Sequence, residues 1–158
     1  MDFALRNFEK QDFEDLWRID QECFPPGISY SRDELSSYMQ ARGGFTIVAE
    51  RSMGDLRSMG DSERILGFVM AEASRGTGHI ITIDMVPASR RFGIGSALLA
   101  AAEQRLRAAK CSRIVMEAAV DNASALAFYK RHGYAAIKTI PQYYSNGVDA
   151  LVLEKKFA

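Results

Sequence analysis

The stretch SRRFGIGSALLAAAEQRL, from Ser89 to Leu106, places two arginines and two glycines directly before a run with helical apolar spacing. The start of a helix exposes about four unpaired backbone N–H groups and carries roughly half a positive charge. Glycine lets a ligand approach that backbone closely, and arginine adds hydrogen-bond donors. Because the β-rich run His79–Val86 comes directly before it, the stretch predicts a strand–loop–helix unit that binds phosphate.

The glycine spacing does not fit two common nucleotide-binding loops. Gly93 and Gly95 are not followed by the Gly-Lys-Ser/Thr sequence of a P-loop, and Leu98 stands where a dinucleotide-binding loop has its third glycine. Taken alone, the short pattern also fits an ordinary glycine-containing helix start with surface arginines. The strand before it and the long helix after it favour the phosphate site.

Composition narrows the class of protein further. The chain has 158 residues, enough for one domain with a real core, and its 20 basic and 20 acidic side chains cancel. This balance argues against nucleic acid or a membrane as the partner. The N-terminus lacks the apolar block of a signal peptide, and two cysteines suit neither a disulfide framework nor a zinc site. We therefore expect a cytoplasmic protein with reduced thiols and no metal.

Apolar periodicity and helix-capping signals predict a mixed α/β or α+β domain with six or seven strands and about four helices. The predicted strands are Phe3–Phe8, Phe45–Glu50, Ile65–Ala73, His79–Val86, Arg113–Val120, Ala135–Ile140 and Ala150–Lys156. The predicted helices are Asp12–Cys23, Ser31 to about Ala41, the run after Gly95 to about Ala109, and Asp121 to the stop at Gly133.

A short repeat interrupts this pattern, because the residues Arg51–Asp55 recur identically as Arg57–Asp61. Two polar copies are too few for a solenoid. The repeat therefore predicts a lengthened, mobile hairpin loop, with a functional loop as the alternative.

Two motifs together resemble a known family. RRFGIGSALL resembles the acyl-CoA pyrophosphate loop of the GNAT superfamily of N-acetyltransferases, and VMEAAVDNASALAFYKRHGY resembles that family's next motif, a strand, an asparagine and a helix with a tyrosine. The order and spacing of the two are more specific than either alone, and the resemblance extends over nearly all of residues 1–158. It implies a GNAT fold, acetyl-CoA as co-substrate and transfer of an acetyl group to an amine.

Within that superfamily, CFPPGISYS and YYSNGVDALVLEK resemble the branch that acetylates protein N-termini, which includes the ribosomal-protein alanine acetyltransferases. The resemblance implies that the acceptor is a peptide N-terminus, with a ribosomal protein as one candidate. It also implies a monomer or weak dimer. It further implies two walls of a peptide slot. One wall holds Phe24, Pro25 and Tyr30, and the other holds Tyr143 and Tyr144. The repeat insert and the sequence IDMVPAS depart from the branch and leave the acceptor preference open.

The same resemblance suggests the cofactor contacts. Backbone groups of the strand segment Ile83, Asp84 and Met85 would pair with the pantetheine arm, and Asn122 would contact it. The loop and helix start would bind the pyrophosphate through Arg91, Phe92, Gly93, Ile94, Gly95 and Ser96.

The resemblance makes Glu117 the general base and Tyr129 the general acid, with Tyr129 also at the cofactor. A lone carboxylate in the apolar run IVMEAAV must either face solvent or lie in a cleft, so Glu117 is unusual on its own terms. His79 and Asp84 are the reserve candidates for the base. A free α-amino group has a pKa near ~8, so a modest base acting through a water is sufficient.

Three functions remain open on the sequence. The leading hypothesis is N-terminal acetylation of a protein or peptide. The alternatives are acetylation of a small amine or a lysine side chain, and a non-catalytic acyl-CoA-binding module of the same fold. Glu117 with Tyr129 argues against the non-catalytic module, and the Phe-Pro and Tyr-Tyr segments argue less strongly against the other acceptors.

Overall fold

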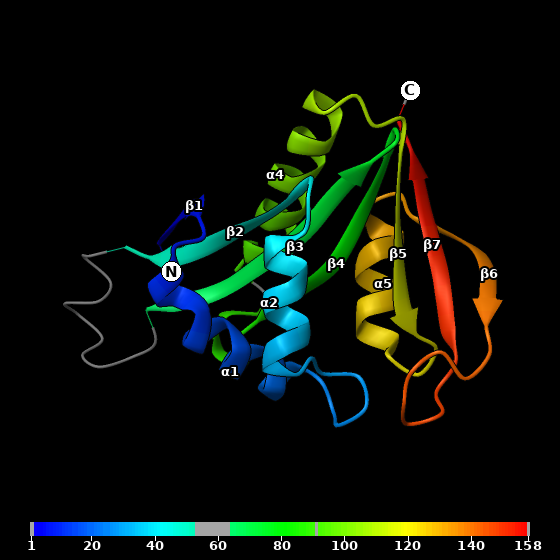
Figure 1. Ribbon diagram of the computed structural model, residues 1–158, viewed down its shortest axis with the longest axis horizontal. Coiled ribbons are helices and arrows are strands. Elements are labelled where there is room, and N and C mark those ends of the chain that lie inside the picture. The colour runs from blue at the N-terminus through cyan, green and yellow to red at the C-terminus, as the bar shows by residue number, and fades with distance from the viewer. Residues whose placement is uncertain (1, 53–63, 91, 158) are drawn as a thin grey trace.

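The computed structural model describes residues 2–52, 64–90 and 92–157. Within these residues, seven strands form one mixed sheet that four α-helices cover (Figure 1). This confirms the α/β fold class that the sequence predicts. Most of the repeat at Arg51–Asp61, with its expected mobility, and Arg91 in the phosphate loop lie outside the described residues.

The observed elements follow the predicted order closely. The strands are β1 (Phe3–Asn7), β2 (Gly44–Arg51), β3 (Ile65–Ser74), β4 (Thr77–Met85), β5 (Arg113–Ala119), β6 (Ala135–Ile140) and β7 (Ala150–Lys156). The helices are α1 (Phe13–Cys23), α2 (Arg32–Gln40), α4 (Ile94–Ala108) and α5 (Ala123–Arg131), with short 3-10 turns η1 (Lys10–Asp12) and η2 (Pro87–Ser89).

Local signals fix where two of these helices begin and end. Ser31 and Glu34 form the predicted capping box at the start of α2, since the Glu34 N–H donates to Ser31 Oγ and the Ser31 N–H donates to Glu34 Oε1. Gly133 follows α5 with a φ of +92°, a conformation that glycine adopts without the cost of a Cβ. Both signals are local, which is why they could be read from the sequence.

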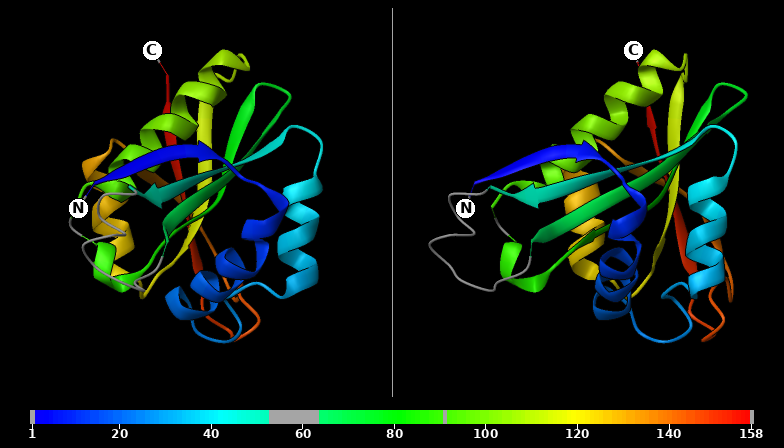
Figure 2. Two further views of the ribbon diagram at one scale, coloured as in Figure 1. Left: turned by 90° about the vertical axis from the view of Figure 1, so that its left-hand side faces the viewer. Right: turned by 60° about the vertical axis from the view of Figure 1, so that its left-hand side comes forward.

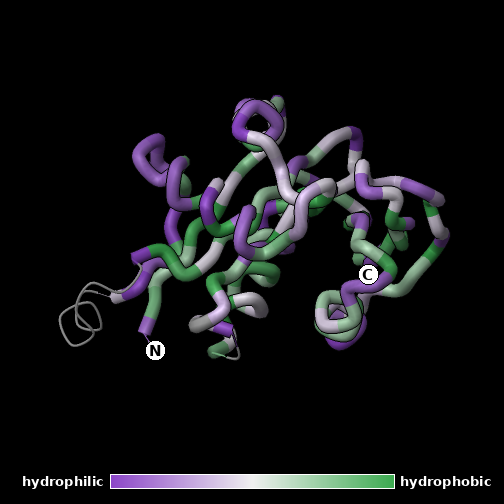
Figure 3. The backbone as a smooth tube through the Cα atoms, turned by 90° about the horizontal axis from the view of Figure 1, so that it is seen from below, coloured by the Kyte–Doolittle hydropathy of each residue, from purple (hydrophilic) through white to green (hydrophobic). Residues whose placement is uncertain are grey.

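The strand order in the sheet is β1-β2-β3-β4-β5-β7-β6. All neighbours pair antiparallel except β4 and β5, which run parallel and are joined by the crossover through α4. Helices α1 and α2 lie on one face of the sheet and α4 and α5 on the other (Figure 2). The apolar residues gather toward the middle of the molecule, between these layers (Figure 3).

Helix α4 shows how the core is built. Leu98, Leu99, Ala102 and Leu106, which share one helical face, are all buried against the sheet. Each buried leucine contributes on the order of 2 kcal/mol of transfer free energy. Ala109, expected on the same face, lies one residue past the end of the helix and is exposed.

The pairing of β4 with β5 is short, and this decides where a site can form. Only Thr77–His79 pairs with Arg113–Val115, although β4 continues to Met85 and β5 to Ala119. A bulge adds to the divergence, because Ile81 has no partner between the paired positions on β3. The two strands therefore part in the middle of the sheet, and the backbone of β4 beyond His79 is not paired with β5.

Candidate active site

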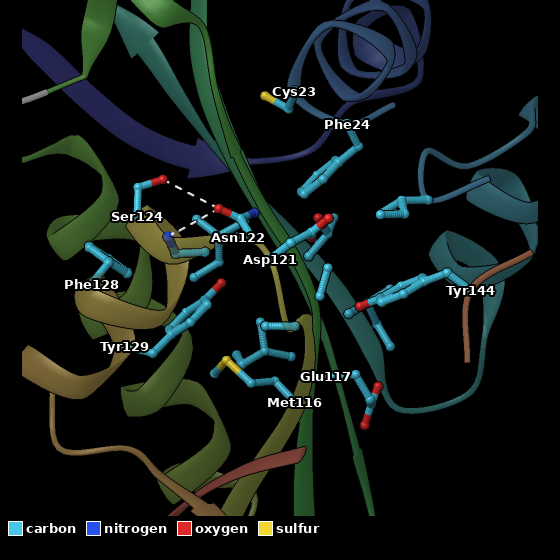
Figure 4. Close-up of a pocket in the computed structure, with 18 of the residues that line it drawn as sticks. Cys23, Phe24, Met116, Glu117, Asp121, Asn122, Ser124, Phe128, Tyr129 and Tyr144 are labelled. Atoms are coloured by element: carbon cyan, nitrogen blue, oxygen red, sulfur yellow. Dashed lines mark hydrogen bonds between the residues drawn. The ribbon is translucent and has the colours of Figure 1, made fainter. Parts of the chain in front are cut away.

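A cavity of about 720 Å³ lies where β4 and β5 part. Its walls come from the segment after α1, from β4 and β5, from α5 and from the loop before β7. In Figure 4, Asn122 and Tyr129 lie on one side of the strands, and Phe24 and Tyr144 lie on the other. The described lining includes ten residues that the sequence predicts: Phe24, Pro25, Tyr30, Ile83, Met85, Glu117, Asn122, Tyr129, Tyr143 and Tyr144.

The predicted phosphate loop lies beside this lining. Gly93 is the N-cap of α4, with a φ of +79°, and no side chain of the described residues caps the helix there. The first-turn N–H groups are therefore open to an anion. Phe92 is half exposed, whereas Ile94 and Gly95 are buried. Arg90 and Arg131, which do line the cavity, place two cations near it.

The two glycines of the loop have different surroundings. A Cβ at Gly93 would meet nothing within 4 Å, but its φ is one that side chains rarely adopt. A Cβ at Gly95 would lie 2.9 Å from Cε of Met85 and 3.3 Å from the ring of Phe128. Gly95 therefore allows α4 to pack closely against β4 and α5.

The β4 segment divides between the cavity and the interior. Ile83 and Met85 line the cavity, whereas the side chain of Asp84 is 1% exposed and is not among the described lining residues. As a reserve base, Asp84 is therefore turned away from the place where an acceptor would enter. Its backbone is still part of the strand edge that β5 leaves unpaired.

Glu117 and His79, which the sequence offers as rival bases, are in direct contact. His79 Nε2 donates to Glu117 Oε1 across 2.8 Å, and His79 Nδ1 lies 3.7 Å from Glu72 Oε1. Burial lowers the pKa of His79, but the hydrogen bond and charge of Glu117, with those of Glu72, outweigh it and raise that pKa above its ordinary value. The three groups form a Glu72–His79–Glu117 row at the point where the strands part.

Tyr129 and Asn122 come from α5. Asn122 is the N-cap of this helix, with its Oδ1 accepting from the Ala125 N–H at 3.2 Å, and it also lines the cavity. Capping and a ligand contact through its amide nitrogen are thus compatible. Tyr129 is buried, and burial raises the pKa of its hydroxyl, so the phenol keeps its proton at neutral pH. Its hydroxyl can act as a donor.

Aromatic side chains form the opposite wall. Tyr30 OH donates to the Ile81 carbonyl oxygen at the β4 bulge, across 3.3 Å. Tyr143 OH lies 3.4 Å from Glu117 Oε1, and its ring packs edge-to-face on Tyr144, with centroids 4.9 Å apart. The two predicted halves of a peptide slot therefore face one cavity next to Glu117.

Among the described lining residues that sequence reasoning did not assign to the site are Cys23, Ile28, Phe128 and Arg131. Cys23 Sγ donates to the Met85 carbonyl oxygen at 3.2 Å, so the end of α1 is joined to β4. Arg131 gave a weak signal, as a cation in the last turn of α5. The other three are apolar or weakly polar, and nothing in their spacing distinguishes them from core residues.

The described residues show neither a cluster of metal-ligating side chains nor a membrane-spanning helix. No three side chains of the His, Cys, Asp or Glu type gather there in a way that could hold a metal ion. In the same residues no helix has the length and apolar character to cross a membrane.

Known proteins share this arrangement. The acetyltransferase (GNAT) family model matches residues 13–134, from α1 through α5. The chain belongs to the GNAT family of acetyltransferases. It thus carries an N-acetyltransferase fold that takes acetyl-CoA as donor, as the two sequence motifs indicate.

Individual relatives agree with the family match. The chain is 31% identical over 153 residues to an uncharacterized N-acetyltransferase of Methanocaldococcus jannaschii, with 96% of this chain and 90% of the relative covered. It is 32% identical over 167 residues to an N-alpha-acetyltransferase of Sulfurisphaera tokodaii, with 96% and 92% covered. The crystal structure of Ard1 from Thermoplasma volcanium superposes with a TM-score of 0.85 over 100% of this chain and 99% of that one, at 22% identity, and so shares the fold.

Proposed function

We propose that this GNAT acetyltransferase transfers the acetyl group of acetyl-CoA directly to the α-amino group at the N-terminus of a protein or peptide. The observation that carries the proposal is that Glu117, which is hydrogen-bonded to His79 and through it lies near Glu72, lines a cavity with aromatic walls. A peptide N-terminus brings an ammonium group that must lose a proton. The row offers negative charge to attract it and a base to accept the proton.

The donor side of the cavity supplies binding and orientation. The β4 edge from Ile80 to Met85, left unpaired by β5, can accept the pantetheine arm as an added strand. The α4 N-terminus with Arg90, Arg131 and the predicted loop residue Arg91 would bind the pyrophosphate. Backbone N–H groups of β4 would stabilise the negative charge that develops on the thioester oxygen.

The chemical step then needs one base and one acid. The amine loses its proton to the Glu117–His79 pair, directly or through a water, and the neutral nitrogen attacks the acetyl carbonyl carbon. The C–N bond forms, the C–S bond breaks, and Tyr129 donates a proton to the departing sulfur. The nitrogen then gives up its second proton, which returns Tyr129 to its protonated form and leaves a neutral amide and the free thiol of CoA. We assign Glu117 as the base and Tyr129 as the acid. His79 orients Glu117 through a hydrogen bond and an ion pair.

The acceptor is proposed by its chemistry. An N-alpha-acetyltransferase relative and the aromatic slot favour a peptide N-terminus over a free polyamine. The resemblance to ribosomal-protein alanine acetyltransferases makes a ribosomal protein in the cytoplasm one candidate acceptor. The same resemblance suggests a monomer or weak dimer.

A peptide-array acetylation assay tests this proposal. Peptides with free N-termini should be acetylated, whereas the same peptides blocked at the N-terminus, including those with internal lysines, and free polyamines should not. Acetylation of blocked, lysine-containing peptides at an equal rate would replace the N-terminus with the lysine side chain as acceptor. Binding of acetyl-CoA without transfer to any acceptor would favour a non-catalytic module.

A further inference from the structure

Two carboxyl groups meet in the interior of the molecule, outside the residues used in the chemistry above. Asp20 on α1 is 0% exposed and Asp84 on β4 is 1% exposed. Helix α1 packs on β4, and each of the two carboxyl groups acts on the pKa of the other. Burying two negative charges side by side would cost free energy, so one of the two carboxyl groups needs a compensating positive charge or a proton.

The hydrogen bonds of the pair leave one oxygen of each carboxyl group without a donor. Asp20 Oδ2 accepts from the Tyr30 backbone N–H at 2.7 Å, and one oxygen of Asp84 accepts from the Thr82 hydroxyl. Among the described residues, Asp20 Oδ1 and Asp84 Oδ2 are buried and have no donor. A proton between the two carboxyl groups would give both of these oxygens a partner.

We propose that Asp20 and Asp84 share one proton, with Asp84 donating it to Asp20, and that this pair positions the peptide-side loop of residues 24–30 on β4. The proposal deepens the proposed function, because it names the residues that hold one wall of the acceptor slot. Asp20 and Asp84 touch neither substrate nor the reacting atoms, and they act through Tyr30.

The groups around the pair favour a retained proton. Glu34 on α2 adds negative charge near Asp20, and the side chains of Cys23, Tyr30 and Tyr129 face Asp84 as neutral thiol and phenols. Arg90 interacts with the Cys23 thiol. Burial raises the pKa of Asp84 well above its usual range, the neighbouring Asp20 raises it further, and the Thr82 hydrogen bond only partly offsets these effects.

The pair belongs to a seam that joins the loop to β4. Asp20 accepts a hydrogen bond from the Tyr30 N–H, and the Tyr30 hydroxyl donates to the Ile81 carbonyl oxygen. Cys23 Sγ donates to the Met85 carbonyl oxygen. The loop between these contacts carries Phe24 and Pro25, which line the cavity. Loss of the shared proton would place two like charges within this seam and loosen the loop.

The direction of the pH effect follows from linkage. A carboxyl group whose pKa is raised in the folded state stabilises that state below its unfolded pKa, and this stabilisation is lost as the pH rises through the folded pKa. The peptide KM should therefore rise as the pH increases through the raised pKa of the pair. The affinity for acetyl-CoA should change less, since the donor side uses the backbone of β4 and the loosened loop carries Phe24 and Pro25.

Three variants test the proposal. Asp84→Asn keeps the β4 backbone and a hydrogen-bond donor toward Asp20 but cannot ionise, so the peptide KM should stay within about twofold of wild type and lose its rise with pH. Asp84→Ala leaves the Asp20 carboxylate buried without a donor at Oδ1 and should raise the peptide KM about tenfold, with a smaller change in the acetyl-CoA Kd. Asp15→Asn, an exposed aspartate on the same helix, is the matched control and should behave as wild type.

Two measurements keep this test separate from the choice of acceptor. Amide hydrogen exchange of Tyr30 reports the attachment of the loop without any substrate, and its protection should be kept in Asp84→Asn and lost in Asp84→Ala. Infrared or carbon NMR spectra of labelled aspartate should show one protonated buried carboxyl at neutral pH. Absence of that signal in the folded wild type, or equal loss of Tyr30 protection in Asp84→Asn and Asp84→Ala, would overturn the proposal even if no peptide were acetylated.

Discussion

The two sides of the cavity differ in the kind of group that lines them, backbone on one side and side chains on the other. The proposed donor side consists mostly of backbone and of groups that leave backbone free, namely the unpaired β4 edge, the α4 start at Gly93 and the cap residue Asn122. The proposed acceptor side consists of side chains, namely aromatic rings and the row from Glu72 to Glu117. Acetyl-CoA, the same donor in every reaction, would contact mainly backbone groups. The acceptor, whose sequence can vary, would contact side chains.

This difference predicts how each side should respond to substitution. On the donor side, a change should alter acetyl-CoA binding and leave the chemistry of bound substrates nearly intact. On the acceptor side, a change should alter kcat, the pH profile or the peptide KM and leave acetyl-CoA binding intact. Five single substitutions test the separation, from the largest expected effect to the smallest.

Glu117→Gln should lower kcat by about 100-fold, because it removes the base while keeping the shape of the side chain. The acetyl-CoA Kd should stay near wild type when measured by calorimetry. Raising the pH should partly restore kcat, since more of the acceptor amine is then neutral without help.

Tyr129→Phe is the contrast to this variant, because its loss of kcat should not be restored by high pH. Full activity of Glu117→Gln at neutral pH would show that the base is misassigned. The double variant Glu117→Gln/His79→Ala would then decide between His79 and a water held by backbone carbonyls.

Gly95→Val should weaken acetyl-CoA binding at least tenfold, or ~1.4 kcal/mol. The added side chain would contact Met85 and Phe128, which moves the start of α4 away from β4 and the phosphate loop out of place. Calorimetry with acetyl-CoA measures this effect, and circular dichroism checks that the variant is folded. An unchanged Kd in a folded variant would show that this loop does not bind the pyrophosphate.

His79→Gln should lower kcat about tenfold, or ~1.4 kcal/mol, and alter the pH dependence of stability. The pKa of His79 is raised in the folded protein, so the ion pair with Glu117 stabilises the fold below the unfolded pKa of about 6.5. This stabilisation is lost as the pH rises through the folded pKa. Thermal unfolding across pH should therefore show the largest deficit of the variant in acid, and a deficit independent of pH would contradict the pairing.

Tyr143→Phe should change kcat by no more than about threefold, because the hydrogen bond removed is long and exposed. The ring, which shapes the slot with Tyr144, is kept. Steady-state kinetics with one peptide and saturating acetyl-CoA measure the change. A loss comparable with that of Glu117→Gln would make Tyr143 part of the chemical machinery and not only of the wall.

How much of this could be predicted depends on how local each feature is. The phosphate loop occupies consecutive residues of one strand–loop–helix unit, and Asn122 and Tyr129 lie on one helix and its cap, so a linear motif contains them. The sequence offers His79 and Glu117, which are 38 residues apart, as alternative bases, because no periodicity shows that β4 and β5 are adjacent at these positions.

The acidic pair illustrates the same limit in the interior. Asp20 falls in the helical pattern of α1 and Asp84 in a β-rich run, and each alone is an ordinary polar residue in an amphipathic element. Their meeting depends on α1 packing over β3 and β4, which buries both carboxyl groups. Burial converts two unremarkable aspartates into a pair that needs a proton.

The sequence by itself determined the order and type of the elements and the fold family, and it predicts the acyl-CoA loop, because these depend on capping, periodicity and motifs within short segments. Only the tertiary structure decided where β4 and β5 part, how Gly95 differs from Gly93, and that His79 joins Glu117. The physical reason is that these features arise from pairing and packing between segments far apart in the chain, where burial and proximity set the hydrogen bonds and the protonation of each group.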